Sequence, residues 1–117
     1  MTPERYCEEI TRRSGSSFGY AMGLLPDEKR RAMYALYAFC RAVDDIADRV
    51  REAEVARAKL GFWREELARV FDGRPWHPIG RELAWARARF GWRPEPFAMV
   101  LDGMQWDIDR RPIRTEA

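Results

Sequence analysis

The sequence has few of the residues from which metal centres and disulfide scaffolds are usually built. It contains one histidine, His77, and two cysteines, Cys7 and Cys40, among 117 residues. Without a Cys-x-x-Cys pair or a second histidine, neither a zinc site nor a disulfide framework is indicated. We therefore expect both cysteines to be reduced, partly buried thiols and His77 to be a loop residue.

Long apolar runs are also absent. No window approaches the roughly 18 consecutive apolar residues that a membrane span requires. The first 13 residues contain Glu4, Glu8 and Glu9 and lack the apolar run of a secretory signal. These features predict a cytoplasmic protein.

The chain carries no large excess of charge of either sign. There are 21 basic and 19 acidic residues, which gives a net charge of +2, and the two signs alternate along the sequence. Nucleic-acid binding usually needs a clustered basic face. Arg64, Glu65, Glu66 and Arg69 instead have the pattern of a solvated helix surface with i,i+4 pairing. We expect no nucleic-acid partner.

The hydrophobic pattern predicts helices and gives no convincing strand. The hydrophobic content of 46% is sufficient for one compact domain. Helices are predicted from Glu4 to about Arg13 and from Pro26 to about Arg51, with residues 14–17 as a loop between them. Three further apolar stripes have helical spacing: Leu60, Trp63, Leu67 and Val70, ending near Asp72; Ile79, Leu83, Ala86 and Phe90; and Phe97, Leu101, Met104 and Ile108. The fold class is all-α.

Residues 44–48, with the sequence Asp-Asp-Ile-Ala-Asp, place carboxylates on the second predicted helix. On a helical wheel Asp44 falls within an apolar arc, and Asp48 projects the same way one turn later, whereas Asp45 points to the polar side. That arc consists of Met33, Leu36, Tyr37, Cys40, Val43 and Ala47. Burying a lone carboxylate costs several kcal/mol, so such a pair must be protonated, paired with Arg41 or compensated by a cation. Hard oxygen ligands favour Mg²⁺.

Simpler interpretations stay open for each of these features. The acidic run also fits an ordinary helix surface on which Arg41 pairs with Asp45, and spacing alone slightly favours this. Ser14, Ser16 and Ser17 could donate to a phosphate, yet such runs mostly connect helices. The aromatic residues that could line an apolar channel are more often core residues: Tyr34, Tyr37, Phe39, Trp63, Trp85 and Trp92.

Several segments in order resemble the squalene/phytoene synthase family. They are residues 14–18 (Ser-Gly-Ser-Ser-Phe), 25–26 (Leu-Pro), 32–33 (Ala-Met), 37–48 (Tyr-Ala-Phe-Cys-Arg-Ala-Val-Asp-Asp-Ile-Ala-Asp) and, more weakly, 103–107 (Gly-Met-Gln-Trp-Asp). The sequence looks most similar to the bacterial branch that makes presqualene diphosphate for hopanoids, with phytoene synthases as the nearest alternative. The resemblance implies the N-terminal part of the isoprenoid synthase helical fold.

The resemblance also implies roles for individual residues. Asp44 and Asp48 would hold Mg²⁺ against a prenyl diphosphate, most simply farnesyl diphosphate, and Arg41 would contact the diphosphate directly. The other implied substrate contacts are Asp45, the serines Ser14, Ser16 and Ser17, and Phe18 and Tyr37 beside the pocket. The implied reaction is head-to-head prenyl transfer, in which magnesium and Arg41 stabilise the departing diphosphate.

The sequence departs from the family pattern by stopping before a second acidic motif. We therefore expect residues 1–117 to form a single incomplete domain with exposed hydrophobic surface. A non-catalytic helical remnant or interaction module is an alternative, as is self-association or a separate chain that supplies the missing half and docks on Phe97, Leu101 and Met104. Peripheral contact with the inner face of the membrane is compatible with an apolar product.

Overall fold

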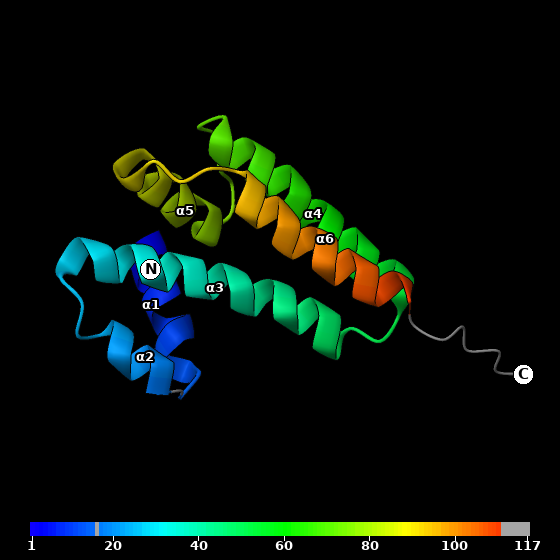
Figure 1. The fold of residues 1–117 in the computed structure, drawn as a ribbon, viewed down its shortest axis with the longest axis horizontal. Helices are drawn as coiled ribbons and strands as arrows, with labels where there is room; N and C mark the ends of the chain where they lie inside the picture. The colour runs from blue at the N-terminus through cyan, green and yellow to red at the C-terminus, as the bar shows by residue number, and fades with distance from the viewer. Residues whose placement is uncertain (16, 111–117) are drawn as a thin grey trace, which may run out of the picture.

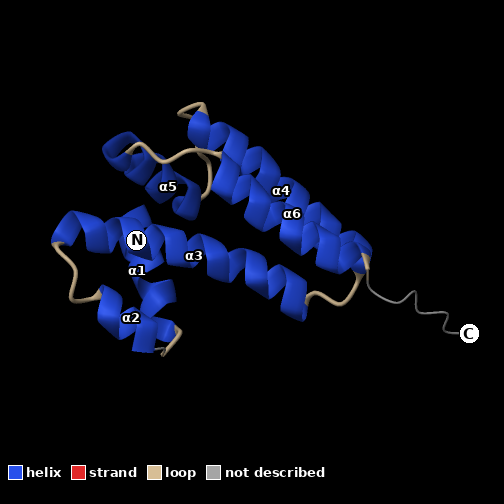
Figure 2. Cartoon of the chain, viewed as in Figure 1, coloured by secondary structure: helices blue, strands red, loops and turns tan. Residues whose placement is uncertain are grey.

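The computed structural model describes residues 1–15 and 17–110, and within these ranges the chain is helical without strands, which confirms the all-α prediction (Figure 2). Among the described residues, six helices follow one another: α1 (Pro3–Arg13), α2 (Ser17–Met22), α3 (Asp27–Arg49), α4 (Ala53–Phe71), α5 (Pro78–Phe90) and α6 (Glu95–Asp109). None of the helices in the described ranges is both long and apolar enough to cross a membrane.

Local sequence signals explain where the helices begin and end. The Thr2 side chain accepts a hydrogen bond from the Arg5 N–H at 3.2 Å and caps α1. At the start of α5, His77 Nδ1 accepts from the Ile79 N–H at 3.0 Å, and Pro78 occupies the first turn. The predicted bounds of α1 and α3 are confirmed to within a few residues, and the three apolar stripes lie within α4, α5 and α6, although α4 begins seven residues before Leu60.

Helix α2 was not predicted. It begins at Ser17, which sequence reasoning had placed in the loop that connects the first two helices. The helix has only six residues and contains Gly19, so it has little periodicity from which to be recognised. It packs against α1 and α3, and these tertiary contacts explain why so short a helix forms.

Helix α3 is the centre of the fold and contacts each of the other five helices. In Figure 1, α2 lies on one side of α3 and α4, α5 and α6 lie on the other, while α1 crosses α3 and also contacts α5. Helices α4 and α6 are side by side and run in opposite directions. Because the other helices pack around α3, its side chains range from fully buried to exposed, and Asp44 and Asp48 are among the exposed ones.

The side of α3 that faces the core differs from the predicted one. The predicted apolar arc is mostly half-buried; of its members only Val43 is fully buried. The core side of α3 is instead made by Ala32, Tyr34, Ala35, Ala38, Phe39, Val43 and Ile46. Apolar residues surround much of this helix, so its sequence did not show which arc the neighbouring helices cover.

Two carboxylates lie in the interior, contrary to the prediction that residues 64–69 form a solvated surface. Glu66 is 0% exposed and Glu82 is 2% exposed. Glu66 accepts hydrogen bonds from the Trp76 N–H at 2.9 Å, the His77 N–H at 2.8 Å and Arg69 Nε at 2.8 Å. These three donors compensate the burial of its charge and join α4 to the start of α5.

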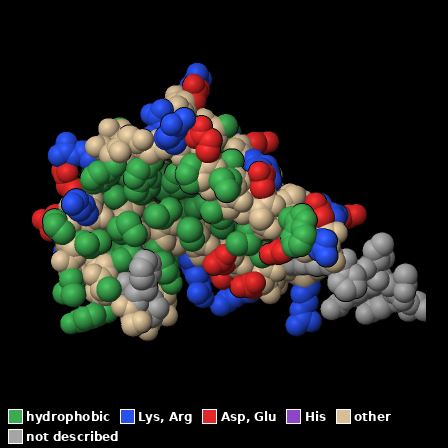
Figure 3. Space-filling model, in the orientation of Figure 1, with side chains coloured by type: hydrophobic (Ala, Val, Ile, Leu, Met, Phe, Trp, Pro, Cys, Tyr) green, Lys and Arg blue, Asp and Glu red, His purple; other side chains and the backbone are tan. Residues whose placement is uncertain are grey.

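The predicted docking stripe on the last helix is also wrong. Phe97 and Leu101 are 7% and 1% exposed because they pack into the core, and Met104 is half-buried. The outer side of α6 exposes Met99 and Trp106, at 71% and 59%. Hydrophobic side chains do reach the surface elsewhere, over the half of the molecule that contains α2 and α5 (Figure 3).

Replacing Gly91 with alanine is expected to destabilise the chain by about 1 kcal/mol. Gly91 ends α5 with a φ of 71°, a left-handed conformation that a Cβ disfavours. Gly103 provides the opposite control, because it lies inside α6 and a Cβ there would meet no atom within 4 Å. Gly103→Ala should therefore stabilise by roughly 0.5–1 kcal/mol. Urea denaturation measures both; equal effects would contradict the assignment.

Candidate functional site

The candidate site is a face of α3 that runs from half-buried to exposed side chains. Tyr37, Arg41, Asp44 and Asp48 are spaced by four, three and four residues, so they share one side of the helix. Tyr37 and Arg41 are half-buried, whereas Asp44 and Asp48 are exposed. The structure thus brings these four predicted residues together along about three turns of one helix.

Asp44 and Asp48 are exposed, so the expectation that burial requires them to be protonated, paired with Arg41 or compensated by a cation is corrected. The repulsion between the two carboxylates still favours a bound cation. The pKa of Asp44 is raised, first by partial desolvation, then by the charges of Asp48 and Asp45, while Arg41 acts in the opposite direction. A cation between Asp44 and Asp48 would relieve this repulsion.

Asp45 links two arginines on the same helix. Its Oδ1 lies 3.4 Å from Arg41 Nε and 3.7 Å from Arg49 Nε. The i,i+4 pair expected for an ordinary helix surface is therefore present. It does not exclude a binding role, because exposed pairs of this kind contribute only about 0–1 kcal/mol and exchange readily for a stronger anion.

The serine loop is only partly described. Ser14 is half-buried, and its hydroxyl donates to the Thr11 carbonyl at 2.6 Å, which helps to end α1. Ser17 is exposed at the first position of α2. Ser16 and the side chain of Phe18 lie outside the described part of the chain. A role of these residues in binding diphosphate therefore remains a prediction.

The donor set suits a metal that is shared with a substrate. Within the described residues, no three side chains of His, Cys, Asp or Glu come together as a metal cluster. Mg²⁺ is commonly held by only one or two carboxylates and completes its shell with water and substrate phosphates. Asp44 and Asp48 fit that smaller requirement.

Sequence reasoning gave His77 no role, but the structure places it beside α4. It caps α5 and packs against Trp63, with ring centroids 4.9 Å apart. The His-Pro step before an apolar stripe is a helix-start signal that could have located the residue. The neighbouring ring of Trp63 could not have been inferred, because it comes from another helix.

The fold defines the class of protein as the N-terminal part of an isoprenoid synthase helical fold. A dehydrosqualene synthase solved with a ligand superposes with a TM-score of 0.83 at 32% identity, over 97% of this chain and 39% of the other. Squalene synthase HpnC from Alicyclobacillus acidocaldarius gives 0.76 at 31% identity, over 92% and 41%. The sequence matches Squalene/phytoene synthase over residues 11–117, and the chain belongs to that family.

The chain is also similar to curated presqualene diphosphate synthases and phytoene synthases. Presqualene diphosphate synthase of Rhodopseudomonas palustris is 49% identical over 61 residues, covering 52% of this chain and 22% of the relative. The enzyme of that name from Zymomonas mobilis is 37% identical over 83 residues, covering 64% and 28%. The 15-cis-phytoene synthase of Synechococcus elongatus is 36% identical over 69 residues, covering 59% and 22%. The aligned part is thus less than a third of each relative's length.

Asp44→Asn is expected to raise the stability of the metal-free chain slightly at pH 7. The pKa of Asp44 is raised in the folded state above its ordinary value of 3.8. As the pH rises above 3.8, the carboxyl therefore ionises first in the unfolded chain, and the folded chain loses stability until its own carboxyl is ionised too. Asparagine removes the unfavourable charge. After solvent screening, we expect a rise in Tm on the order of 1 °C by calorimetry in EDTA.

Asp109→Asn provides a control of opposite sign. Hydrogen bonds from Arg57 and Gln105 lower the pKa of Asp109. Its charge therefore stabilises the fold above pH 3.8, and this contribution is lost as the pH falls through the lowered pKa. The Asp109→Asn variant should melt lower than the parent chain at pH 7. A lower Tm for both variants would show that Asp44 is not electrostatically strained.

Proposed function

We infer that the chain provides the first diphosphate-binding face of a prenyltransferase that joins two farnesyl diphosphates head to head. In this reaction two farnesyl diphosphates yield presqualene diphosphate, inorganic diphosphate and a proton. The observation that carries the proposal is the α3 face, on which Arg41, Asp44 and Asp48 lie together. Family membership and the similarity to presqualene diphosphate synthases support it.

The residues of this face would have different roles in binding a diphosphate. Asp44 and Asp48 would hold Mg²⁺, which when bound neutralises charge on the leaving diphosphate. Arg41 is already beside a carboxylate, 3.4 Å from Asp45, and would exchange that partner for phosphate oxygens. Tyr37, half-buried one turn earlier on the same face, would contact the substrate beside the diphosphate.

A phytoene synthase-type reaction on geranylgeranyl diphosphate is the second candidate. The 36% identity to a 15-cis-phytoene synthase supports it, although the Rhodopseudomonas palustris relative is more similar at 49%. Both reactions would use the same α3 face, and their substrates differ in the length of the prenyl chain. A competition experiment, in which farnesyl and geranylgeranyl diphosphate compete for binding to the protein, distinguishes the two candidate functions.

The test is a calorimetric titration of the 117-residue chain with farnesyl diphosphate, with and without Mg²⁺. We expect saturable binding that requires Mg²⁺, and a loss of about tenfold or more in affinity for Asp44→Asn and for Asp48→Asn, since each removes a charged ligand. Because binding is measured without turnover, the result does not require catalysis.

Asp107→Asn supplies the matched control. Asp107 is also an exposed helical aspartate, but it lies on α6 and has no carboxylate one turn away. Its replacement should leave the affinity unchanged. If Asp107→Asn and Asp44→Asn weaken binding equally, the effect comes from net charge and the assignment of the site is wrong.

A further inference from the structure

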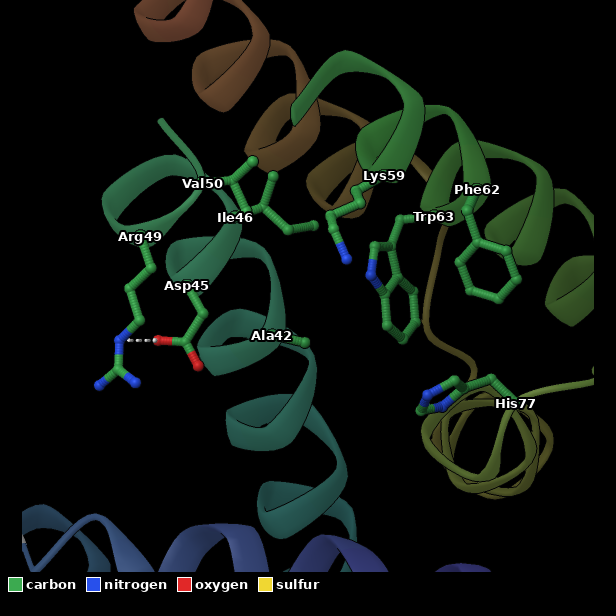
Figure 4. A pocket seen from close by; sticks show the side chains of 9 residues that line it. All are labelled: Ala42, Asp45, Ile46, Arg49, Val50, Lys59, Phe62, Trp63 and His77. Carbon is green, nitrogen blue, oxygen red and sulfur yellow. Dashed lines mark ion pairs between the residues drawn. The ribbon is translucent and has the colours of Figure 1, made fainter. Parts of the chain in front are cut away.

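A second candidate site lies between α3 and α4, away from Asp44 and Asp48. It is an open groove of about 470 Å³, within the range of roughly 300–1,000 Å³ typical of ligand pockets. The side chains that line it are shown in Figure 4: Ala42, Asp45, Ile46, Arg49, Val50, Lys59, Phe62, Trp63 and His77. Sequence reasoning and the proposed function leave this groove without a role.

One wall of the groove presents nitrogen donors. Figure 4 shows the Lys59 amine, the Trp63 indole nitrogen and the His77 ring directed toward the same space. Trp63 is only 6% exposed, and within the described ranges its indole N–H has no hydrogen-bond partner. Lys59 likewise has no ion pair among the described residues. Donors that converge without acceptors indicate a site for a negatively charged or strongly accepting group.

The position of the His77 proton adds a third donor. Nδ1 accepts a hydrogen bond from the Ile79 N–H at 3.0 Å, so in the neutral ring the proton resides on Nε2. The pKa of His77 is lowered by burial, which keeps the ring neutral at physiological pH. Nε2 is thus a donor, and the Nδ1 contact fixes the orientation of the ring.

The part of the opposite wall that faces Lys59 is apolar. Ala42, Ile46 and Val50 of α3 face Lys59 across the groove (Figure 4). The Asp45–Arg49 ion pair also lines the groove, but in Figure 4 it points away from Lys59. Phe62, 37% exposed, packs edge-on against Trp63 with ring centroids 5.4 Å apart. A ligand in this groove would therefore meet hydrocarbon on one side and donors on the other.

We propose that this groove binds an amphipathic anion, namely a phosphate or carboxylate attached to a hydrocarbon chain. The headgroup contacts Lys59, Trp63 Nε1 and His77 Nε2, and the hydrocarbon packs on Ile46, Val50 and Phe62. This second site is separate from the prenyl diphosphate face of α3 and does not rest on the proposed function.

The test is an NMR and calorimetric titration of the 117-residue chain with monomeric decyl phosphate in the absence of Mg²⁺. We expect saturable binding, with the Trp63 indole N–H signal, assigned through Trp63→Phe, shifting most. Inorganic phosphate and decanol should each bind at least about tenfold more weakly, since each retains half of the interactions. Saturable binding of either one with undiminished affinity would overturn the proposal.

Lys59→Met should weaken decyl phosphate binding about tenfold or more, because it removes a charged donor without shortening the side chain greatly. Lys29 and Lys59 are the two lysines of the chain, and Lys29 is exposed in the first turn of α3, far from the groove. Lys29→Met is thus a matched control and should retain the parent affinity. Equal losses in the two variants, or no loss in Lys59→Met, would overturn the assignment.

Two further experiments distinguish binding in this groove from binding on the diphosphate face and identify the source of the headgroup. Asp44→Asn should leave decyl phosphate binding unchanged; a loss would place the ligand on the diphosphate face instead. Phosphatidylcholine vesicles containing phosphatidic acid test whether a lipid surface is the source of the same headgroup. Lys59-dependent binding to monomer or vesicles supports the anion site and identifies its source, whereas binding to neither overturns it.

Discussion

Glu66→Ala is expected to lower the free energy of unfolding by about 3–5 kcal/mol, the largest single effect predicted for this chain. Glu66 is fully buried and accepts from the Trp76 and His77 backbone N–H groups and from Arg69 Nε. Alanine would leave two backbone donors and a guanidinium without an acceptor in the interior. Urea denaturation monitored by circular dichroism measures the change.

Glu65→Ala is the control for this experiment. Glu65 is adjacent in sequence, but its side chain is 76% exposed and its contact with Arg69 is 4.0 Å long. The expected change is within about 0.5 kcal/mol. Gly80→Ala should also destabilise, because a Cβ on Gly80 would overlap the Glu66 carboxylate. A Glu66→Ala variant as stable as Glu65→Ala would show that this tether between α4 and α5 contributes nothing.

Arg31→Met is expected to cost about 3 kcal/mol, the second-largest effect. Glu82 is 2% exposed and accepts from Arg31 Nε at 2.6 Å and Nη2 at 3.0 Å. Arg31 also stacks on Trp85, with its guanidinium carbon 3.9 Å from the ring centroid. Removing Arg31 leaves a buried carboxylate without its counter-charge, and methionine retains only part of the packing.

The double variant Arg31→Met, Glu82→Leu should recover most of that loss, because it removes both charges and leaves apolar side chains of similar volume. Thermal melts of the two single variants and the double variant complete the cycle. If the double variant loses the sum of the single losses, the two residues act independently and the ion pair is not the cause.

The local elements could be predicted from sequence more fully than their packing. The stripe of Leu60, Trp63, Leu67 and Val70 is buried as expected, because one amphipathic face of α4 is enough to define it. The core side of α3 could not be chosen in the same way, since that helix is apolar around much of its circumference. Likewise Glu66 could not be recognised as buried, because two of its three donors come from a loop ten and eleven residues later.

The candidate site could be predicted from the sequence because it lies on one helix. Arg41, Asp44 and Asp48 share a face by spacing alone, and the structure places them so. The groove could not be predicted in this way, because its donors Lys59 and His77 are brought together by the packing of α4 against the start of α5. A site built from two elements requires the tertiary structure.

The most direct test of the central claim is to replace Mg²⁺ with paramagnetic Mn²⁺ in NMR spectra of the labelled chain with farnesyl diphosphate. We expect selective broadening of the amide signals around Asp44 and Asp48, dependent on the diphosphate and lost in Asp44→Asn. Broadening centred on other carboxylates, such as those of α1 or α6, or none at all, would contradict the assignment of this face as the metal and diphosphate site.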